Sequence, residues 1–152
     1  MATFHNLLRN VAVVQRATQV TGSTAASNLP GIDMLGYTGI SWIVLPAGTP
    51  TTGFSFKAQE CSSSGFSTGS DVADLTGTDV PFSTAIVDGF AGIDIFRPAK
   101  RWVRAVLVKT STADLIDGAI GIVYNALEAA VTHSTAKNYG VEYFVTPATG
   151  TA

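Results

Sequence analysis

The chain has 152 residues, with nine lysines and arginines, eleven acidic residues and a charged fraction of 13%. This charged fraction is about half of the usual ~25%, so the surface is polar but sparsely charged, which lowers the free-energy cost of burying it against a partner. A net charge of −2 argues against whole-molecule affinity for nucleic acid, because phosphate binding requires an excess of clustered cations. The length favours a single domain.

The composition and the ends of the chain also limit where the protein acts. The single Cys61 cannot form an intrachain disulfide, and the residues beside it include no base or cation that would activate a thiol. We therefore expect Cys61 to be a small, half-buried residue on a strand. Arg9 and Arg16 interrupt the N-terminal apolar run, which argues against a secretory signal. The most apolar later stretch, residues 115–127, is too short and too polar to span a bilayer. We expect synthesis in a cytoplasm and no membrane partner.

Short strands are predicted along the whole chain, because apolar and polar residues alternate and turn residues interrupt the alternation at short intervals. In chain order the predicted strands are residues 11–21, 32–38, 40–46, 54–61, 72–80 (a short strand or turn), 82–89, 91–97, 101–110, 118–127 and 141–145. A short helical turn at Leu127–Val131 is an alternative at the end of the ninth segment. Eight or nine strands without a long amphipathic helix predict an all-β sandwich or barrel, of which a jelly roll is one form.

Alternation within three strands predicts which side chains face inward. Ile32 and Met34 are predicted to face the core, with Leu35 as a further candidate. In residues 54–61 one side carries Phe54, Phe56, Ala58 and Glu60, and the other carries Ser55, Lys57, Gln59 and Cys61. In residues 102–108 one side carries Val103, Ala105 and Leu107, and the other carries Trp102, Arg104, Val106 and Val108.

Catalytic motifs are not evident. The two histidines, His5 and His133, lie near the ends of the chain, where a rigid catalytic triad is not expected. There is no nucleophile elbow, phosphate-binding loop or dinucleotide-binding glycine motif, and one cysteine with two distant histidines does not match a zinc site. We therefore predict no catalytic, cofactor-binding or metal-binding residues, and we expect that the protein is not an enzyme.

Five aspartates precede the most basic part of the chain: Asp71, Asp74, Asp79, Asp88 and Asp94. Their oxygens would suit calcium, but the spacing does not match a known calcium loop, so we favour turn chemistry, in which aspartate caps its own backbone. A β-sandwich hydrolase that uses a carboxylate pair, with Glu60 as a further candidate, stays open as an alternative.

The segment from Arg97 to Thr110 holds five of the nine positive charges on a predicted strand. The side that carries Arg104 also carries apolar residues, which indicates contact with protein rather than open water. The first interpretation is cross-strand pairing between these cations and the five aspartates. The second is an interface with another protein. Nucleic-acid binding is the least favoured, because the segment has no aromatic stacking motif beyond Trp102.

The residues 31–127 also resemble a known family. The quoted motifs are "GIDMLGYTGISWIVLPAG", "FSFKAQECSSSGFST", "AGIDIFRPAKRWVRAVLVKTST" and "DGAIGIVYNAL". This order is similar to the small structural proteins encoded in the head-gene clusters of tailed bacteriophages. The matching residues are Lys57, Gln59, Glu60, Ser62, Arg101, Trp102, Val103 and Arg104. The sequence departs from the family pattern at Cys61, which separates the usual Glu-Ser pair, and in a longer tail after Ala130.

The resemblance implies a capsid decoration (cement) protein with a jelly-roll-like two-sheet sandwich and extended termini. It implies no cofactor, the major capsid protein as partner, self-association as a homodimer or homotrimer, and a place on the outside of the virion. The implied organisation is an N-terminal arm or first strand at residues 1–20, a sandwich at 21–132 and a C-terminal extension at 133–152. The termini are candidate arms that add a strand to a neighbour's sheet.

The candidate partner interface comprises Arg97, Arg101, Trp102, Arg104, Tyr139 and Tyr143. The alternative function is a carbohydrate-binding or receptor-binding jelly-roll module of a phage particle. For that function the candidate stacking residues are Trp42, Trp102, Tyr37, Tyr139 and Tyr143.

Overall fold

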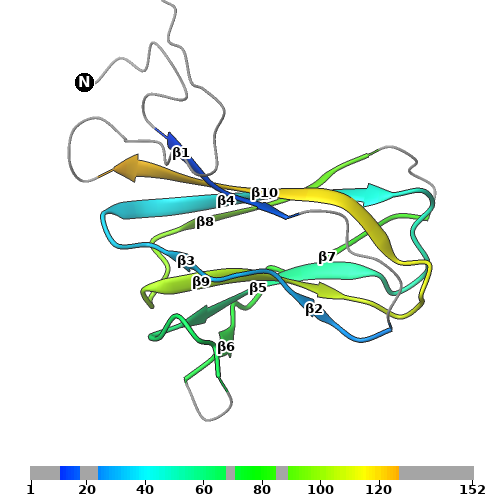
Figure 1. The fold of residues 1–152 in the computed structure, drawn as a ribbon, viewed down its shortest axis with the longest axis horizontal. Helices are drawn as coiled ribbons and strands as arrows, with labels where there is room; N and C mark the ends of the chain where they lie inside the picture. Colours follow the sequence, from blue (N-terminus) through cyan, green and yellow to red (C-terminus); the bar gives the residue numbers. More distant parts are fainter. Residues whose placement is uncertain (1–10, 18–23, 68–70, 85–88, 127–152) are drawn as a thin grey trace, which may run out of the picture.

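The computed structural model describes residues 11–17, 24–67, 71–84 and 89–126, and these form an all-β sandwich (Figure 1). The strands are β1 (Val11–Ala17), β2 (Ser27–Asn28), β3 (Ile32–Asp33), β4 (Tyr37–Ala47), β5 (Ser55–Cys61), β6 (Ala73–Asp74), β7 (Val80–Pro81), β8 (Ala91–Phe96), β9 (Trp102–Val108) and β10 (Leu115–Ala126). Within these described ranges there is no helix that is both long enough and apolar enough to cross a bilayer.

The strands form two antiparallel sheets that pack face to face. The first has the order β1-β10-β4-β8, and the second has the order β2-β9-β5-β6, with β3 also paired to β9 and β7 also paired to β5. The pieces β2 and β3 occupy one strand position, as do β6 and β7, so the sandwich has eight positions. The first position pairs with the last, the second with the seventh, the third with the sixth and the fourth with the fifth. This folded-hairpin pairing is that of a jelly roll, which confirms the predicted fold class.

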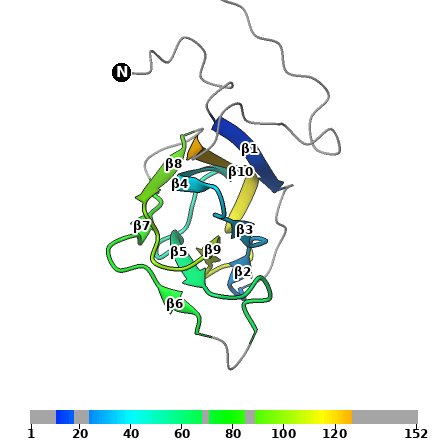
Figure 2. The same ribbon diagram turned by 90° about the vertical axis from the view of Figure 1, so that its left-hand side faces the viewer.

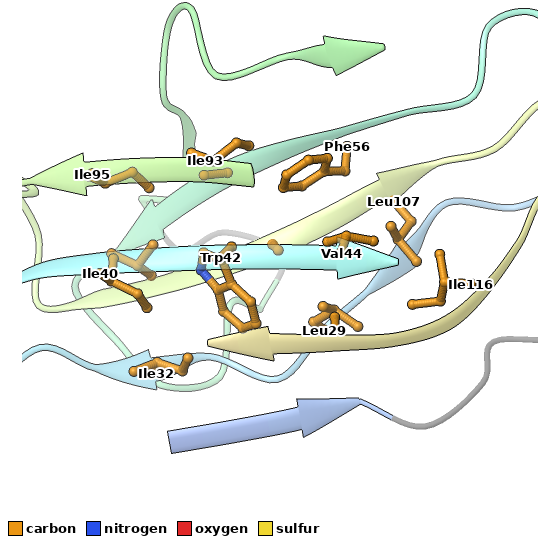
Figure 3. Close-up of a cluster of buried hydrophobic side chains, with 14 of the residues drawn as sticks. Leu29, Ile32, Ile40, Trp42, Val44, Phe56, Ile93, Ile95, Leu107 and Ile116 are labelled. Carbon is orange, nitrogen blue, oxygen red and sulfur yellow. The ribbon is translucent and has the colours of Figure 1, made fainter. Parts of the chain in front are cut away.

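Inward-facing residues of both sheets form one hydrophobic core (Figure 3). Trp42 of β4 is its largest fully buried side chain, and it is paired in register with Gly121 of β10. A β-carbon at position 121 would lie 2.8 Å from the Ile32 side chain and 3.1 Å from the Trp42 ring. The smallest residue therefore stands opposite the largest one, and the two sheets can close around the indole.

Two strands confirm the predicted alternation. In the pairing of β5 with β9, Phe56 lies opposite Leu107 and Ala58 opposite Ala105, and all four are fully buried. The outward row pairs Gln59 with Arg104. Cys61 is fully buried rather than half-buried.

The structure also corrects several expectations. Ile32 and Met34 are buried as predicted, but Leu35 lies at the tip of the β3–β4 turn and is 68% exposed. The strand predicted at residues 82–89 is wrong within the described residues, because the strand there is β7 at Val80–Pro81 and the chain leaves the sheet at Phe82. The last described strand begins at Leu115, earlier than predicted. Of the strand predicted at residues 11–21, residues 11–17 form β1. Residues 18–21 and the segments predicted at residues 127–131 and 141–145 lie outside the described residues.

The sandwich has two ends with different chemistry. At one end, the β8–β9 end, lie the β3–β4 and β8–β9 turns, the start of β1 and the finish of β10. Figure 2 looks onto this end. At the other, the β9–β10 end, lie the β4–β5, β7–β8 and β9–β10 connections.

Candidate interaction surfaces

The five cations of the segment 97–110 lie in different environments. Arg104 is half-buried on β9, and its Nε and one terminal nitrogen both donate to Gln59 Oε1, at 2.9 and 2.7 Å. Its guanidinium also lies 4.4 Å from the ring centre of Phe66. Burial lowers the pKa of Arg104. Arg104 therefore makes its contacts within its own chain. It joins Gln59, on the outer face of the second sheet, to Phe66 in the loop that covers this face.

That covering loop, residues 62–67, is held by Asp71. The Asp71 carboxylate accepts hydrogen bonds from the Ser62 amide at 3.0 Å, from the Ser62 hydroxyl at 2.5 Å and from Cys61 Sγ at 3.4 Å. These donors, the Ser62 hydroxyl first, hold the pKa of Asp71 well below its usual range. Lys100 forms an ion pair with the same carboxylate at 3.4 Å. The loop thereby seals Cys61 and places the Phe66 ring against Gly31 and Arg104.

The prediction that the cations pair with the five aspartates is only partly confirmed. Lys100 pairs with Asp71 as expected. Arg101 instead pairs with Asp33, which was not in the predicted set. Lys109 is buried.

The other predicted aspartates bind elsewhere. Asp74 pairs with Lys57, Asp79 accepts from the Ser55 hydroxyl, and Asp94 accepts from the Tyr124 hydroxyl. Asp88 lies outside the described residues.

The outer face of the first sheet is mostly apolar. Ile43 on β4 lies opposite Ile120 on β10, and Ile122 is two residues further along β10. All three are half-buried. Tyr124 extends across Gly39, where a β-carbon would come within 2.2 Å of its ring, and donates to Asp94 on β8 at 2.5 Å. Burial first, and then the Asp94 carboxylate, raise the pKa of Tyr124 to about 12. Both partners are thus held in one hydrogen bond at neutral pH.

The described residues form two shallow grooves, of which the second contains two of the predicted aspartates. A groove of about 280 Å³ at the β9–β10 end is lined mainly by proline, phenylalanine and glycine, including Pro46, Phe82 and Phe90. A groove of about 360 Å³ on the second sheet brings Asp74 and Asp79 together. Both of these acids already accept hydrogen bonds from β5 side chains. Within the described part of the chain, no group of three or more histidine, cysteine or acidic side chains could hold a metal ion.

Glu60, the further acid considered for a hydrolase, binds the backbone of its own chain. It is buried at the end of β5 and accepts hydrogen bonds from the amides of Ala99 and Lys100, at 2.9 and 3.2 Å. The carboxylate thus holds the backbone of the β8–β9 turn.

Trp42, a candidate stacking residue for a carbohydrate, is fully buried and cannot reach a sugar. Trp102 and Tyr37 are half-buried.

One buried carboxylate was not singled out from the sequence. Asp114 is fully buried in the β9–β10 connection. It accepts from the Thr51 amide and hydroxyl and from the Thr110 and Ser111 amides, at distances between 2.5 and 3.2 Å. Burial alone would raise the pKa of Asp114, but these donors outweigh burial and lower it. The short run of serines and threonines around Asp114 could have indicated a turn of this kind, although not its link to Thr51, 63 residues away.

The predicted interface residues do not form one surface. Arg97 and Arg101 are exposed at the β8–β9 end, Trp102 is half-buried beside them, and Arg104 binds Gln59. Tyr139 and Tyr143 lie outside the described residues, as do both histidines and most of the two predicted arms. Residues 11–17, within the predicted N-terminal segment, form the edge strand β1.

Comparison with known proteins finds no family and a weak structural similarity. No protein-family model matches the sequence, and no curated protein sequence matches it. A similar solved chain comes from work described as "Bacillus endospore appendages form a novel family of disulfide-linked pili". It is 11% identical, and the alignment covers 78% of this chain and 90% of that chain with a TM-score of 0.39. A similarity at this level does not extend to function.

Proposed function

We propose that this protein is a structural component of a tailed-phage particle, which binds the outer surface of the head as a small homo-oligomer and stabilises the capsid lattice. It is made in the host cytoplasm and ends on the outside of the virion. Its major capsid protein and copies of itself are its partners, and its role requires no chemical step, cofactor or nucleic acid.

The observation that carries this proposal is the outer face of the first sheet. The outward face of an antiparallel sheet is usually polar when it meets water. Here the outward positions on β4 and β10 present Ile43, Ile120 and Ile122, and the nearby Asp94 is engaged by Tyr124. A face with so little charge has a low desolvation cost, which suits contact with a second copy.

The family resemblance of residues 31–127 supports a phage head as the place of assembly. Binding in many copies also suits a sandwich of this size, because avidity over a shell compensates for a modest affinity at each site.

The test compares heads that carry the protein with heads from a phage deleted for its gene. Adding the purified protein back should restore co-sedimentation with the heads and should raise their rupture temperature. The mass of the protein in solution should be that of a dimer or trimer. Heads that rupture at equal temperatures and do not bind the protein would overturn the proposal. A strict monomer that binds a glycan would favour the alternative binding module.

A further inference from the structure

Exposed apolar side chains gather with cations at the β8–β9 end. Leu35, at the tip of the β3–β4 turn, is 68% exposed, and Phe96, the last residue of β8, is 58% exposed. The Arg97 guanidinium lies 5.1 Å from the centre of the Phe96 ring. A large aromatic residue next to an arginine is a common composition of interface hot spots.

The two turns at this end are tied together. The Arg101 guanidinium donates to both carboxylate oxygens of Asp33, at 2.8 and 2.6 Å. Asp33 also accepts from the Leu35 amide at 2.9 Å, and the Met34 amide donates to the Arg101 carbonyl at 2.8 Å. These bonds hold Leu35 in place before any partner arrives, so binding would lose little conformational entropy.

The backbone of Arg97 is in a left-handed conformation, with φ of 54°. A non-glycine residue there is strained, and such strain is concentrated at functional sites. The conformation turns the chain out of β8, where the Arg97 amide donates to the Thr38 carbonyl at 2.7 Å. The Arg97 side chain itself is exposed, so its own burial does not account for the strain.

Arg97 differs from the two neighbouring cations of the β8–β9 turn in its ion pairing. Arg101 is matched by Asp33, and Lys100 is matched by Asp71. Among the described residues, no carboxylate lies within ion-pairing distance of Arg97. One exposed arginine without an ion pair is too little for nucleic acid, which requires several phosphate contacts, but it suits a carboxylate at the edge of a protein surface.

We propose that the β8–β9 end, defined by Leu35, Phe96, Arg97 and Arg101, is the surface that docks on the shell. Its partner is an apolar depression of the capsid protein that accepts Phe96 and Leu35 and is bordered by a carboxylate that pairs with Arg97. This inference rests on the proposed function and adds to it the surface that meets the head.

The experiment measures the binding of purified variants to heads from the gene-deleted phage, by co-sedimentation over a range of protein concentrations. Phe96→Ser and Arg97→Glu should each weaken binding at least about tenfold, as expected for central hot-spot residues. Arg97→Lys keeps the charge and should lose less. The matched control is Phe90→Ser, which changes another exposed phenylalanine at the β9–β10 end and should bind like the wild type.

Thermal unfolding and solution mass show whether each variant keeps its fold and oligomeric state. If Phe96→Ser does not fold, Arg97→Glu carries the test, because this side chain is exposed and lies outside the core. If the wild type binds the heads and both variants bind equally well, the proposal of this docking surface is wrong, and the proposed function still stands. Loss of binding in Phe90→Ser alone would place the contact at the opposite end. Absence of wild-type binding would overturn both proposals.

Discussion

The loop after β5 and the turn after β8 each contain a non-glycine residue with a left-handed backbone, but its side chain is buried in the first and exposed in the second. Each has a non-glycine residue in the left-handed region, Phe66 with φ of 44° and Arg97 with φ of 54°. Phe66 is 8% exposed, because its ring packs against Gly31 and the Arg104 guanidinium. Arg97 is exposed beside an exposed Phe96.

The difference shows how the same local strain is balanced in two ways. At Phe66 the burial of an aromatic side chain and the Asp71 hydrogen bonds offset the strain within the folded chain. At Arg97 the described contacts are one backbone hydrogen bond and one exposed cation–π contact. The first region therefore contributes to the stability of the sandwich, and the second presents side chains to a partner.

The largest expected effect is on Phe66. Phe66→Ala should lower the free energy of unfolding by about 3 kcal/mol, because the burial of an aromatic ring is lost while the backbone strain is unchanged. Denaturant titration measures this change. The matched control, Phe96→Ala, should change the free energy of unfolding by less than about 0.5 kcal/mol. Equal losses in the two variants would show that the two regions contribute alike to stability.

A smaller effect is expected at the arginine that contacts Phe66. Arg104→Lys should lower the free energy of unfolding by about 1 kcal/mol, because an ammonium cannot donate from two nitrogens to Gln59 while lying flat on the ring. The control is Arg101→Lys in the exposed pair with Asp33, where a loss below about 0.5 kcal/mol is expected. A double-mutant cycle of Arg104→Ala with Phe66→Ala should show coupling. Strict additivity would contradict the contact.

These regions also show how far the amino-acid sequence predicts the molecule. The period-two alternation in residues 54–61 and 102–108 predicts the strands and their inward faces correctly, because burial on one side of a sheet enforces that pattern. The alternation gives the wrong face for Leu35, because this residue lies in a turn, where side chains do not alternate between two faces of a sheet. It also fails at residues 82–84, where the chain leaves the sheet although Phe82 is apolar and buried.

The candidate surface was predicted only in part, for a different reason. Alternation places Arg104 on an outward row but does not show that the loop 62–67 folds over that row. Phe66 contacts Arg104 on β9, and Asp71 pairs with Lys100 in the β8–β9 turn, so both contacts join distant parts of the sequence. The exposure of Phe96 depends equally on which strands lie beside β8. Arg97 and Arg101 were predicted from the concentration of charge alone.

A local effect without global unfolding is expected at Asp71. Asp71→Asn should weaken the bonds that close the loop over Cys61 and should increase the rate at which a thiol reagent labels this single cysteine. Asp74→Asn, an exposed acid on β6 paired with Lys57, is the control and should leave the labelling rate unchanged. Equal labelling rates in the wild type and Asp71→Asn would contradict the role of the carboxylate.

The same loop should respond to acid in the wild type. The pKa of Asp71 is lowered in the folded protein, chiefly by the Ser62 hydroxyl. Its contribution is therefore complete above the ordinary carboxyl pKa of ~3.9 and is lost as the pH falls through the lower, folded value. A dipyridyl disulfide, which reacts with thiols in acid, should label Cys61 slowly near that ordinary pKa and faster below it. Faster labelling that begins near neutral pH would point to another group.

The effect that isolates backbone strain is expected at Arg97. Arg97→Gly and Arg97→Ala remove the same side-chain contacts, but only glycine adopts a left-handed φ without strain. The glycine variant should therefore have the higher free energy of unfolding, by about 1 kcal/mol. At Phe66 the corresponding pair should both be strongly destabilised, because the lost burial of the ring outweighs the relief of strain. If Arg97→Ala equals Arg97→Gly in denaturant titration, the turn after β8 is unstrained, and its conformation gives no support to a docking role for the side chain.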